Sequence, residues 1–338
     1  MTTDPDRRLA PVIRLAPAKV NLTLAVLGTR ADGFHDLHSV MVPLDLADRL
    51  SASVAPSGEA DSLHVDGFDP GPESDNLVVR AIAAAPRAAR PAWGRHEPPP
   101  PLAARLDKRI PVAAGLAGGS SDAAAAADAA LEAWGVALDP ETRHALFAGL
   151  GSDVPFFLGS GPALVEGRGE RLTPLPWLRD ADAAHDRPGL LLVTPAVAIS
   201  TPAAFRAWDE GARTGGGAAR LASAHLAEEL RTGLRVADLL ARASVLAAAN
   251  DLAPAAIAVE PALVPFKRAL LRLLGRPVGL SGSGPSHWAL YPSLTEAAAA
   301  ADTLRAAVAT GALPSPGGRV PFIAATRILA TAAPKRDA

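Results

Sequence analysis

A glycine-rich run over residues 108–122 has the composition of an anion-binding loop. Its sequence is KRIPVAAGLAGGSSD, and an alanine-rich segment of high helix propensity follows at once. Glycine lets backbone approach a ligand closely, and a helix start offers unpaired N–H donors and the positive end of the helix dipole. The run therefore predicts a phosphate site, although a strand-to-helix connection that binds nothing has the same composition. No Gly-Lys-Ser/Thr closes it as in a Walker loop, and no acidic residue follows at the spacing of the dinucleotide fingerprint.

Three polar residues outside this run are candidates for catalysis. Lys19 and Asn21 lie two apart in the apolar residues 12–27, a pattern typical of a strand, so their side chains share one face. They either form part of a site or belong to an edge strand that exposes both to water. Lysine occurs only at positions 19, 108, 267 and 335, which favours a specific use for Lys19 and Lys108. Asp153 precedes a short apolar segment as either a helix cap or a carboxylate that accepts a proton.

An aromatic residue and a histidine are adjacent in the loop over residues 28–36. Phe34 could stack on a planar base, and His35 could hydrogen-bond to it. The alternative is that His35 simply caps the strand that follows.

The chain alternates between strands and helices that must position these groups. Asn76 caps a predicted helix over residues 77–85, which Pro86 ends, and the proline-rich residues 86–101 are expected to form an exposed loop. The glycine run leads into a helix from Ser120 or Ser121 to Gly135. The other predicted helices begin at Thr201 or cover 140–149, 219–230, 235–248, 261–274 and 294–310. Strands are predicted at 12–27, 37–46, 63–65, 102–106, 190–193 and 320–329, with the sheet continuing over 45–54 and a hairpin over 161–172. Residues 278–291 are predicted as a second glycine-serine turn that leads into a strand. Residues 177–188 are expected to form a hinge between two halves.

Composition excludes several classes of function. The 338 residues are 49% hydrophobic and 20% charged, enough to bury a sizeable core. A net charge of −2 argues against a nucleic-acid or membrane-surface binder, and no apolar run reaches the ~18 residues that a bilayer span needs. The N-terminal residues lack an apolar signal core, which predicts a cytoplasmic protein. Since the chain has no cysteine, disulfides, thiolate metal sites and cysteine nucleophiles are excluded.

The spacing of three stretches resembles the GHMP kinase family. These are PAKVNL at 17–22, the glycine run at 111–121, and GLSGSG at 279–284. Two more, ADGFH at 31–35 and GSDVPFF at 151–157, are similar to a branch of this family whose substrate is a cytidine-diphosphate-linked alcohol. The resemblance spans residues 11–330 and implies an α+β, two-lobed fold with its active site in the interdomain cleft. It implies an N-terminal ATP-binding domain at 11–175 and a C-terminal substrate-side domain at 186–331.

The resemblance also implies an activity and a role for each candidate residue. The activity is ATP-dependent phosphorylation of a 2-hydroxyl on the small-molecule cytidine-diphosphate substrate, within the non-mevalonate isoprenoid route and with Mg²⁺. Asp153 would be the base, Lys19 would stabilise negative charge beside it, and Asn21 would support both on the substrate side. Phe34 and His35 would hold the cytosine, and Asn76 and Lys108 would lie near the adenosine. The residues expected to wrap the ATP phosphates are Pro111, Val112, Ala113, Ala114, Gly115, Leu116, Ala117, Gly118, Gly119, Ser120 and Ser121.

Several features stay open at this point. The magnesium ligands are unknown, with Ser120 or Ser121 as candidates, and the chain could be a monomer or a homodimer. Two alternative functions remain. The chain could be a kinase of another small alcohol, such as homoserine or mevalonate, or a nucleotide-binding regulator without catalytic activity. Alanine stands at 113, 114 and 117, where the family often has glycine, and a methyl group is tolerable there if φ stays negative. Phe34 replaces the family's common tyrosine, and Asp122 is expected to face away from the phosphates.

Overall fold

The structure, a computed structural model, describes residues 10–94, 96–179, 187–211 and 217–329. Its seven-stranded sheet follows the order β4-β5-β3-β6-β7, and β1 and β2 also pair with the long strand β3. All these pairs are antiparallel except β4 with β5. The strands are β1 (Val12–Asn21), β2 (Ala25–Thr29), β3 (His35–Val54), β4 (Ser62–Gly67), β5 (Leu102–Lys108), β6 (Ala163–Gly167) and β7 (Arg171–Pro174).

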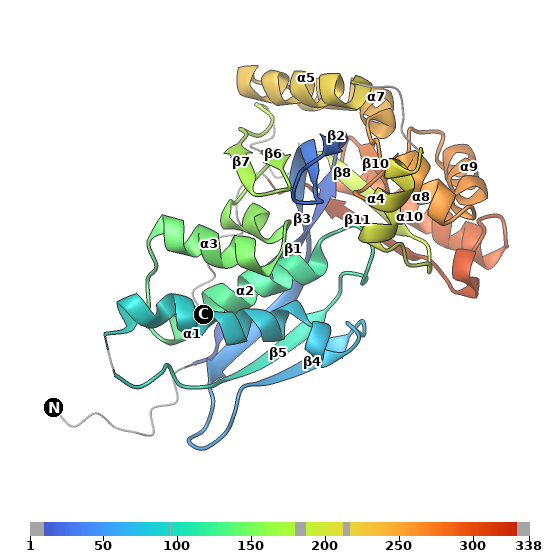
Figure 1. The fold of residues 1–338 in the computed structure, drawn as a ribbon. Helices are drawn as coiled ribbons and strands as arrows, with labels where there is room; N and C mark the ends of the chain where they lie inside the picture. Colours follow the sequence, from blue (N-terminus) through green and yellow to red (C-terminus); the bar gives the residue numbers. More distant parts are fainter. Residues whose placement is uncertain (1–9, 95, 180–186, 212–216, 330–338) are drawn as a thin grey trace.

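A second, four-stranded antiparallel sheet is built from the C-terminal part of the chain in the order β11-β8-β10-β9. Its strands are β8 (Gly189–Thr194), β9 (Gly279–Leu280), β10 (His287–Tyr291) and β11 (Phe322–Arg327). The two sheets meet where the middle of β3 passes the end of β11 (Figure 1). There Leu44 pairs with Ile328, and Thr326 Oγ1 accepts the N–H of Leu46 at 3.0 Å.

Three helices cover one face of the first sheet: α1 (Leu77–Trp93), α2 (Gly118–Ala133) and α3 (Pro140–Leu150). Helix α2 is almost entirely buried, between α1 and strands β1 and β3, because its many alanines let the neighbouring backbones come close. Figure 1 shows α1 and α2 side by side over β1 and β5. This packing fixes where the helix N-terminus, and the loop before it, stand relative to β1.

The remaining helices lie around the second sheet and along its junction with the first. Helices α9 and α10 pack against β8 and β10, while α5, α6 and α7 close a core that lies between the two sheets. Together with three short 3₁₀ segments, these elements are α4 (Thr201–Asp209), α5 (Ala218–Thr232), α6 (Val236–Ala241), α7 (Ala243–Ala248), α8 (Ala253–Val259), α9 (Leu263–Leu274), α10 (Leu294–Ala309), η1 (Glu73–Asp75), η2 (Val154–Leu158) and η3 (Pro316–Gly318). Within the described ranges, no helix has the length and apolarity that crossing a bilayer requires.

The expectation that Pro86 ends a helix and begins an exposed loop is wrong. Helix α1 continues through Pro86 and Pro91 and ends at Gly94, whose φ of 64° is the left-handed conformation of a helix end. A proline inside a helix removes one hydrogen bond and crowds the preceding turn. Here the buried faces of Ala85 and Ala89 keep the helix against the core, so packing outweighs that cost.

Other boundaries differ in smaller ways. The helix expected over 235–248 is two helices, interrupted at Arg242, and α8 lies in a stretch for which none was expected. Helix α2 starts at Gly118, two residues earlier than the serines suggested. Part of the expected hinge, residues 180–186, lies outside the described residues, and the division into domains at 11–175 and 186–331 stays a prediction.

Candidate active site

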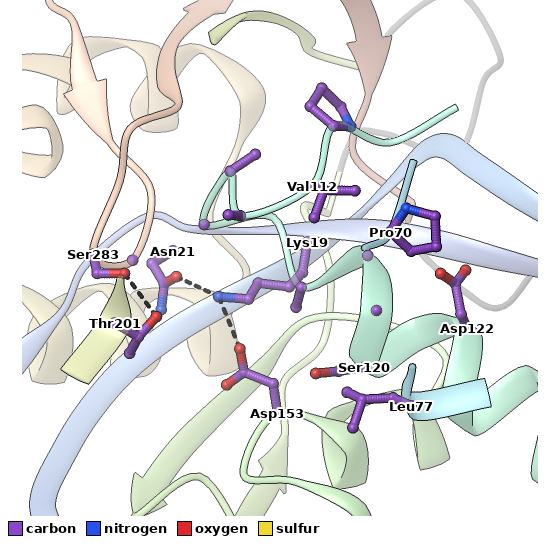
Figure 2. A pocket seen from close by; sticks show the side chains of 18 of the residues that line it. Lys19, Asn21, Pro70, Leu77, Val112, Ser120, Asp122, Asp153, Thr201 and Ser283 are labelled. Carbon is purple, nitrogen blue, oxygen red and sulfur yellow. Dashed lines mark hydrogen bonds and ion pairs between the residues drawn. The ribbon is translucent and has the colours of Figure 1, made fainter. Parts of the chain in front are cut away.

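Lys19, Asn21 and Asp153 meet in one place (Figure 2). Lys19 Nζ donates to Asn21 Oδ1 at 2.8 Å and lies 3.4 Å from Asp153 Oδ2. Lys19 and Asn21 are only 3% and 2% exposed, so the edge-strand alternative is wrong. Asp153 precedes η2 but caps nothing with its side chain, and about a third of that side chain is exposed. The site therefore holds a buried ammonium beside a solvent-accessible carboxylate.

A chain of hydrogen bonds fixes the orientation of Asn21. Its Nδ2 donates to Ser39 Oγ at 2.8 Å, and that hydroxyl donates to the carbonyl of Thr23 at 2.6 Å. The amide oxygen must then face Lys19, which directs the ammonium toward Asp153. The pairing of β1 with β3 shifts register between Pro17 and Lys19, and the N–H of Lys19 bonds to the Leu116 carbonyl at 3.0 Å. Strand β1 and the glycine-rich loop are thus joined directly at the site.

The glycine-rich loop has three residues in the left-handed region at alternate positions. Their φ values are 53° at Ala113, 75° at Gly115 and 53° at Ala117. Alternation of this kind turns successive backbone N–H groups toward one side and makes an anion-binding concavity. The condition that φ stays negative at the alanines holds for Ala114 but is wrong for Ala113 and Ala117. The concavity requires the left-handed conformation at those two positions whichever residue occupies them.

The second glycine-serine turn, residues 281–284, packs on this loop. A Cβ atom at Gly115 would lie 2.4 Å from the Ser281 carbonyl oxygen, so only glycine allows the approach. Ser281 Oγ donates to the Gly115 carbonyl at 2.9 Å. Asn250 Nδ2 donates at 2.9 Å to the carbonyls of both Leu280 and Gly282 and so fixes the turn from the other side.

The loop and its surroundings enclose a first cavity of about 380 Å³. Lys19, Asn21, Asn76, Lys108 and Asp153 all line it. Most of the expected phosphate-loop residues line it as well, namely Pro111, Val112, Ala113, Ala114, Gly115, Ala117, Gly118, Gly119 and Ser120. Leu116 and Ser121 do not, because both side chains are buried behind the loop. Asn76 is buried and caps α1, accepting the N–H of Val78 at 2.9 Å.

Asp122 does not face away from the cavity as expected. It lines the cavity as the fifth residue of α2 and pairs with Lys108, whose Nζ lies 2.9 Å from its Oδ2. Lys108 also donates to Asp48, and all three side chains are at least 96% buried. Burial, together with the nearby Asp48 carboxylate, raises the pKa of the Asp122 carboxyl to about 8, although the Lys108 ammonium opposes the shift. A neutral Asp122 removes the repulsion that the sequence suggested.

A second cavity, of about 480 Å³, adjoins the first. Both are lined by Ser120, Asp153, Thr201 and Phe205, so the carboxylate of Asp153 is reached from either side. Thr201 Oγ1 lies 3.1 Å from Ser283 Oγ, a contact drawn in Figure 2.

Phe34 and His35 lie in the second cavity. His35 stacks on Phe205 with ring centroids 4.5 Å apart, and its Nε2 lies 3.0 Å from Asp209 Oδ1. The main side-chain contacts of His35 are therefore with Phe205 and Asp209, and not those of a residue that only caps the following strand. Phe34 is 47% exposed, and the Arg168 guanidinium lies 4.7 Å from its ring centroid. The cavity thus combines aromatic faces with both positive and negative groups.

Sequence reasoning missed several residues of the site. Phe205, Asp209 and Arg168 line the second cavity, and Asp48 and Asn250 hold the loops of the first. An aspartate inside a strand and a phenylalanine inside an amphipathic helix are common in any protein, so composition alone could not identify them. Among the described residues, no group of three or more histidines and acidic residues is arranged to hold a metal ion.

Comparison with known proteins identifies the family. The model for the GHMP kinases N terminal domain matches residues 76–161, and the model for the GHMP kinases C terminal matches residues 226–310. The chain is similar to the 4-diphosphocytidyl-2-C-methyl-D-erythritol kinases of a Synechococcus species, at 41% identity over 86% of this chain and 90% of the relative, and of Paramagnetospirillum magneticum, at 39% over 86% and 93%. A crystal structure of 4-(cytidine 5'-diphospho)-2C-methyl-D-erythritol kinase is 31% identical, with a TM-score of 0.64 over 93% of this chain and 99% of that one. The chain therefore belongs to the GHMP kinase family of phosphotransferases, which use ATP as co-substrate, and within that family it groups with the 4-diphosphocytidyl-2-C-methyl-D-erythritol kinases.

Proposed function

We propose that the protein transfers the γ-phosphoryl group of ATP to the 2-hydroxyl of 4-diphosphocytidyl-2-C-methyl-D-erythritol in the non-mevalonate isoprenoid route. The observation that carries this proposal is the position of Asp153, beside Lys19 and at the junction of the two cavities. ATP would occupy the first cavity, with its phosphates on the loop over residues 111–121. The alcohol would enter from the second cavity, so that its hydroxyl lies between Asp153 and the phosphates.

In this arrangement Asp153 accepts the proton of the attacking hydroxyl. Lys19 is buried, so its ammonium acts in a region of low dielectric and stabilises the charge that develops on the attacking oxygen. Asn21 holds the ammonium in place through the hydrogen bond to its Oδ1. Phosphoryl transfer depends mainly on such positioning and charge neutralisation, which these three side chains and the loop amides supply.

The cytidine diphosphate of the alcohol substrate and the adenosine of ATP would contact different residues. The half-exposed ring of Phe34, His35 and the ring of Phe205 offer stacking and hydrogen-bonding groups for a cytosine, and Arg168 and Arg206 offer positive charge for the diphosphate. Asn76 and Lys108 would lie on the adenosine side of the first cavity. We propose Phe34, His35 and Asn21 as substrate-side residues, and the domains at 11–175 and 186–331 as the two walls of the cleft.

Mg²⁺ fits this site as an ion carried largely by the nucleotide. Magnesium favours one or two protein oxygens together with phosphates and water over a protein cage. Ser120 fits this requirement better than Ser121, because Ser120 lines both cavities and Ser121 is buried. When bound, the ion would neutralise charge on the phosphate oxygens.

An ADP-release assay on the purified protein tests the proposal. With ATP and the cytidine-diphosphate substrate, turnover is expected, and cytidine nucleotides without the methylerythritol group should compete for the second cavity. Turnover with homoserine or mevalonate but not with the cytidine compound would contradict the proposed substrate. ATP binding without turnover on any of these alcohols would instead favour a silent nucleotide-binding regulator.

A further inference from the structure

A single buried ion bridge connects the two ends of the phosphate loop. Lys108 is the last residue of β5, immediately before the loop, and Asp122 is the fifth residue of α2, the helix that follows the loop. Lys108 Nζ lies 2.9 Å from Asp122 Oδ2 and also donates to Asp48 on β3. The ammonium thus links the loop's entry, its exit and the central strand of the sheet.

Asp48 also holds the first loop residues through their backbone. Its Oδ1 accepts the N–H groups of Arg109 and Ile110, the second at 2.7 Å. Asp48 is 0% exposed, so its charge can be accommodated only because these donors and the Lys108 ammonium satisfy it. A carboxylate with three donors in one place is a rigid anchor for the loop's entry.

The helix start leaves room for this bridge. A Cβ atom at Gly118 would lie 2.9 Å from Lys108 Nζ and 2.9 Å from Ile110 Cγ2. At Gly119, one residue further, the nearest such atom is the Leu77 Cδ1 at 3.8 Å, an ordinary contact. A methyl group at 118 would therefore force the Lys108 ammonium and Ile110 to shift from their present positions.

We propose that the Asp48–Lys108–Asp122 bridge is a positioning device for ATP, which holds residues 109–117 in their anion-binding conformation before the nucleotide arrives. Lys108 then acts through the loop, because its ammonium already binds the side chains of Asp48 and Asp122. A loop that is ordered in advance loses less entropy on binding, so the bridge strengthens ATP binding without touching the phosphates. The inference rests on the proposed placement of ATP in the first cavity.

The test compares two substitutions at one position. Asp122→Ala removes the acceptor and is expected to raise the KM and the Kd for ATP by at least ~10-fold, with kcat at saturating ATP and the KM for the alcohol within about twofold. Asp122→Asn keeps an oxygen for the ammonium and is expected to stay within about threefold of the wild type. Asp128→Asn is the control, because Asp128 lies further along α2 and pairs with Arg143 on α3. Weakening this ion pair away from the loop should leave ATP binding unchanged.

Two results would overturn the inference: wild-type ATP affinity in Asp122→Ala, or a loss in Asp122→Asn as large as that in Asp122→Ala. Should Asp122→Ala fail to fold, Gly118→Ala replaces it, because its methyl group displaces the ammonium while every charge remains. Wild-type ATP affinity in folded Gly118→Ala would equally contradict the proposal. The Kd is measured by calorimetry with ATP alone, so an error in the proposed alcohol substrate leaves this test intact.

Discussion

At the scale of single residues, the proposed chemistry depends on the contrast between Lys19 and Asp153. The ammonium is buried and its position is set by Asn21, whereas the carboxylate is open to both cavities. A buried charge needs a partner, and the partner of Lys19 is Asp153, the group that we propose as the base. In the proposed mechanism the attacking hydroxyl approaches this ion pair, so that Asp153 takes its proton while Lys19 stabilises the developing charge.

Replacement of Asp153 by asparagine tests this role. The variant keeps the size and one oxygen of the side chain but cannot take the proton, so kcat should fall at least ~100-fold. ATP affinity should stay within about threefold, since the phosphates contact the loop rather than this residue. Steady-state kinetics and calorimetry with ATP measure the two effects. Turnover at the wild-type rate in Asp153→Asn would exclude Asp153 as the base.

At the scale of elements, the phosphate loop carries backbone strain. Ala113 and Ala117 adopt positive φ, which costs an alanine ~1–2 kcal/mol and costs glycine almost nothing. The neighbours of the loop hold it in this shape: the second glycine-serine turn packs on Gly115, and Asp48 binds its first amides. The surrounding structure thus maintains a conformation that the local sequence disfavours.

Replacement of Ala113 by glycine should release this strain. Ala113 is exposed, so the methyl group contributes little packing, and the gain exceeds the ~0.5–1 kcal/mol that glycine loses through unfolded-state flexibility. The free energy of unfolding is expected to rise by up to ~1 kcal/mol, measured by urea denaturation. Ala114→Gly is the matched control, because residue 114 is buried and lacks positive φ, and it should lose ~1 kcal/mol or more. A loss of stability in both variants would contradict the strained conformation.

Much of this element could be predicted from the sequence because its determinants are local. The two-residue period placed Lys19 and Asn21 on one face, the helix predicted over 140–149 is α3, and the glycines marked the loop. The continuation of α1 through Pro86 could not be predicted, because it depends on packing against a distant core. Likewise, the contacts of Asp48 with the loop exist only once β3 and β5 pair, so sequence spacing gave no indication of them.

At the scale of the whole molecule, the site lies where the two sheets meet. The first sheet supplies Lys19 and Asn21 on β1, and the second supplies the turn before β10 that packs on the phosphate loop. Asn250 and Asp251, between α7 and α8, connect the C-terminal part of the chain to the first sheet. Leu24 pairs with Asn250, and Asp251 accepts the N–H of Val26 at 3.1 Å. The proposed binding surface for both reactants is therefore built from distant parts of the chain, and folding of the whole is needed to form it.

Two buried titratable groups make the stability of the whole molecule depend on pH in opposite directions. Burial raises the pKa of Asp122 to about 8, so the folded state holds a proton that the unfolded chain has lost above pH ~4. This contribution is present at low pH and is lost as pH rises through 8. Burial, with the nearby Lys267 charge, lowers the pKa of His287 to about 3, so its contribution is present above pH ~6.5 and is lost as pH falls. Between pH 4 and 6.5 the two oppose each other.

The window from pH 6.5 to 8 therefore isolates Asp122. Each pH unit should lower the free energy of unfolding by up to ~1.4 kcal/mol, because the folded state holds one more proton than the unfolded chain. Urea midpoints at the two ends of this window measure the fall. Asp122→Asn resembles the protonated side chain at every pH, so its stability should change much less across the window. An equal fall in the wild type and in this variant would show that the ion bridge contains no proton, and that Asp122 binds Lys108 as a permanent carboxylate.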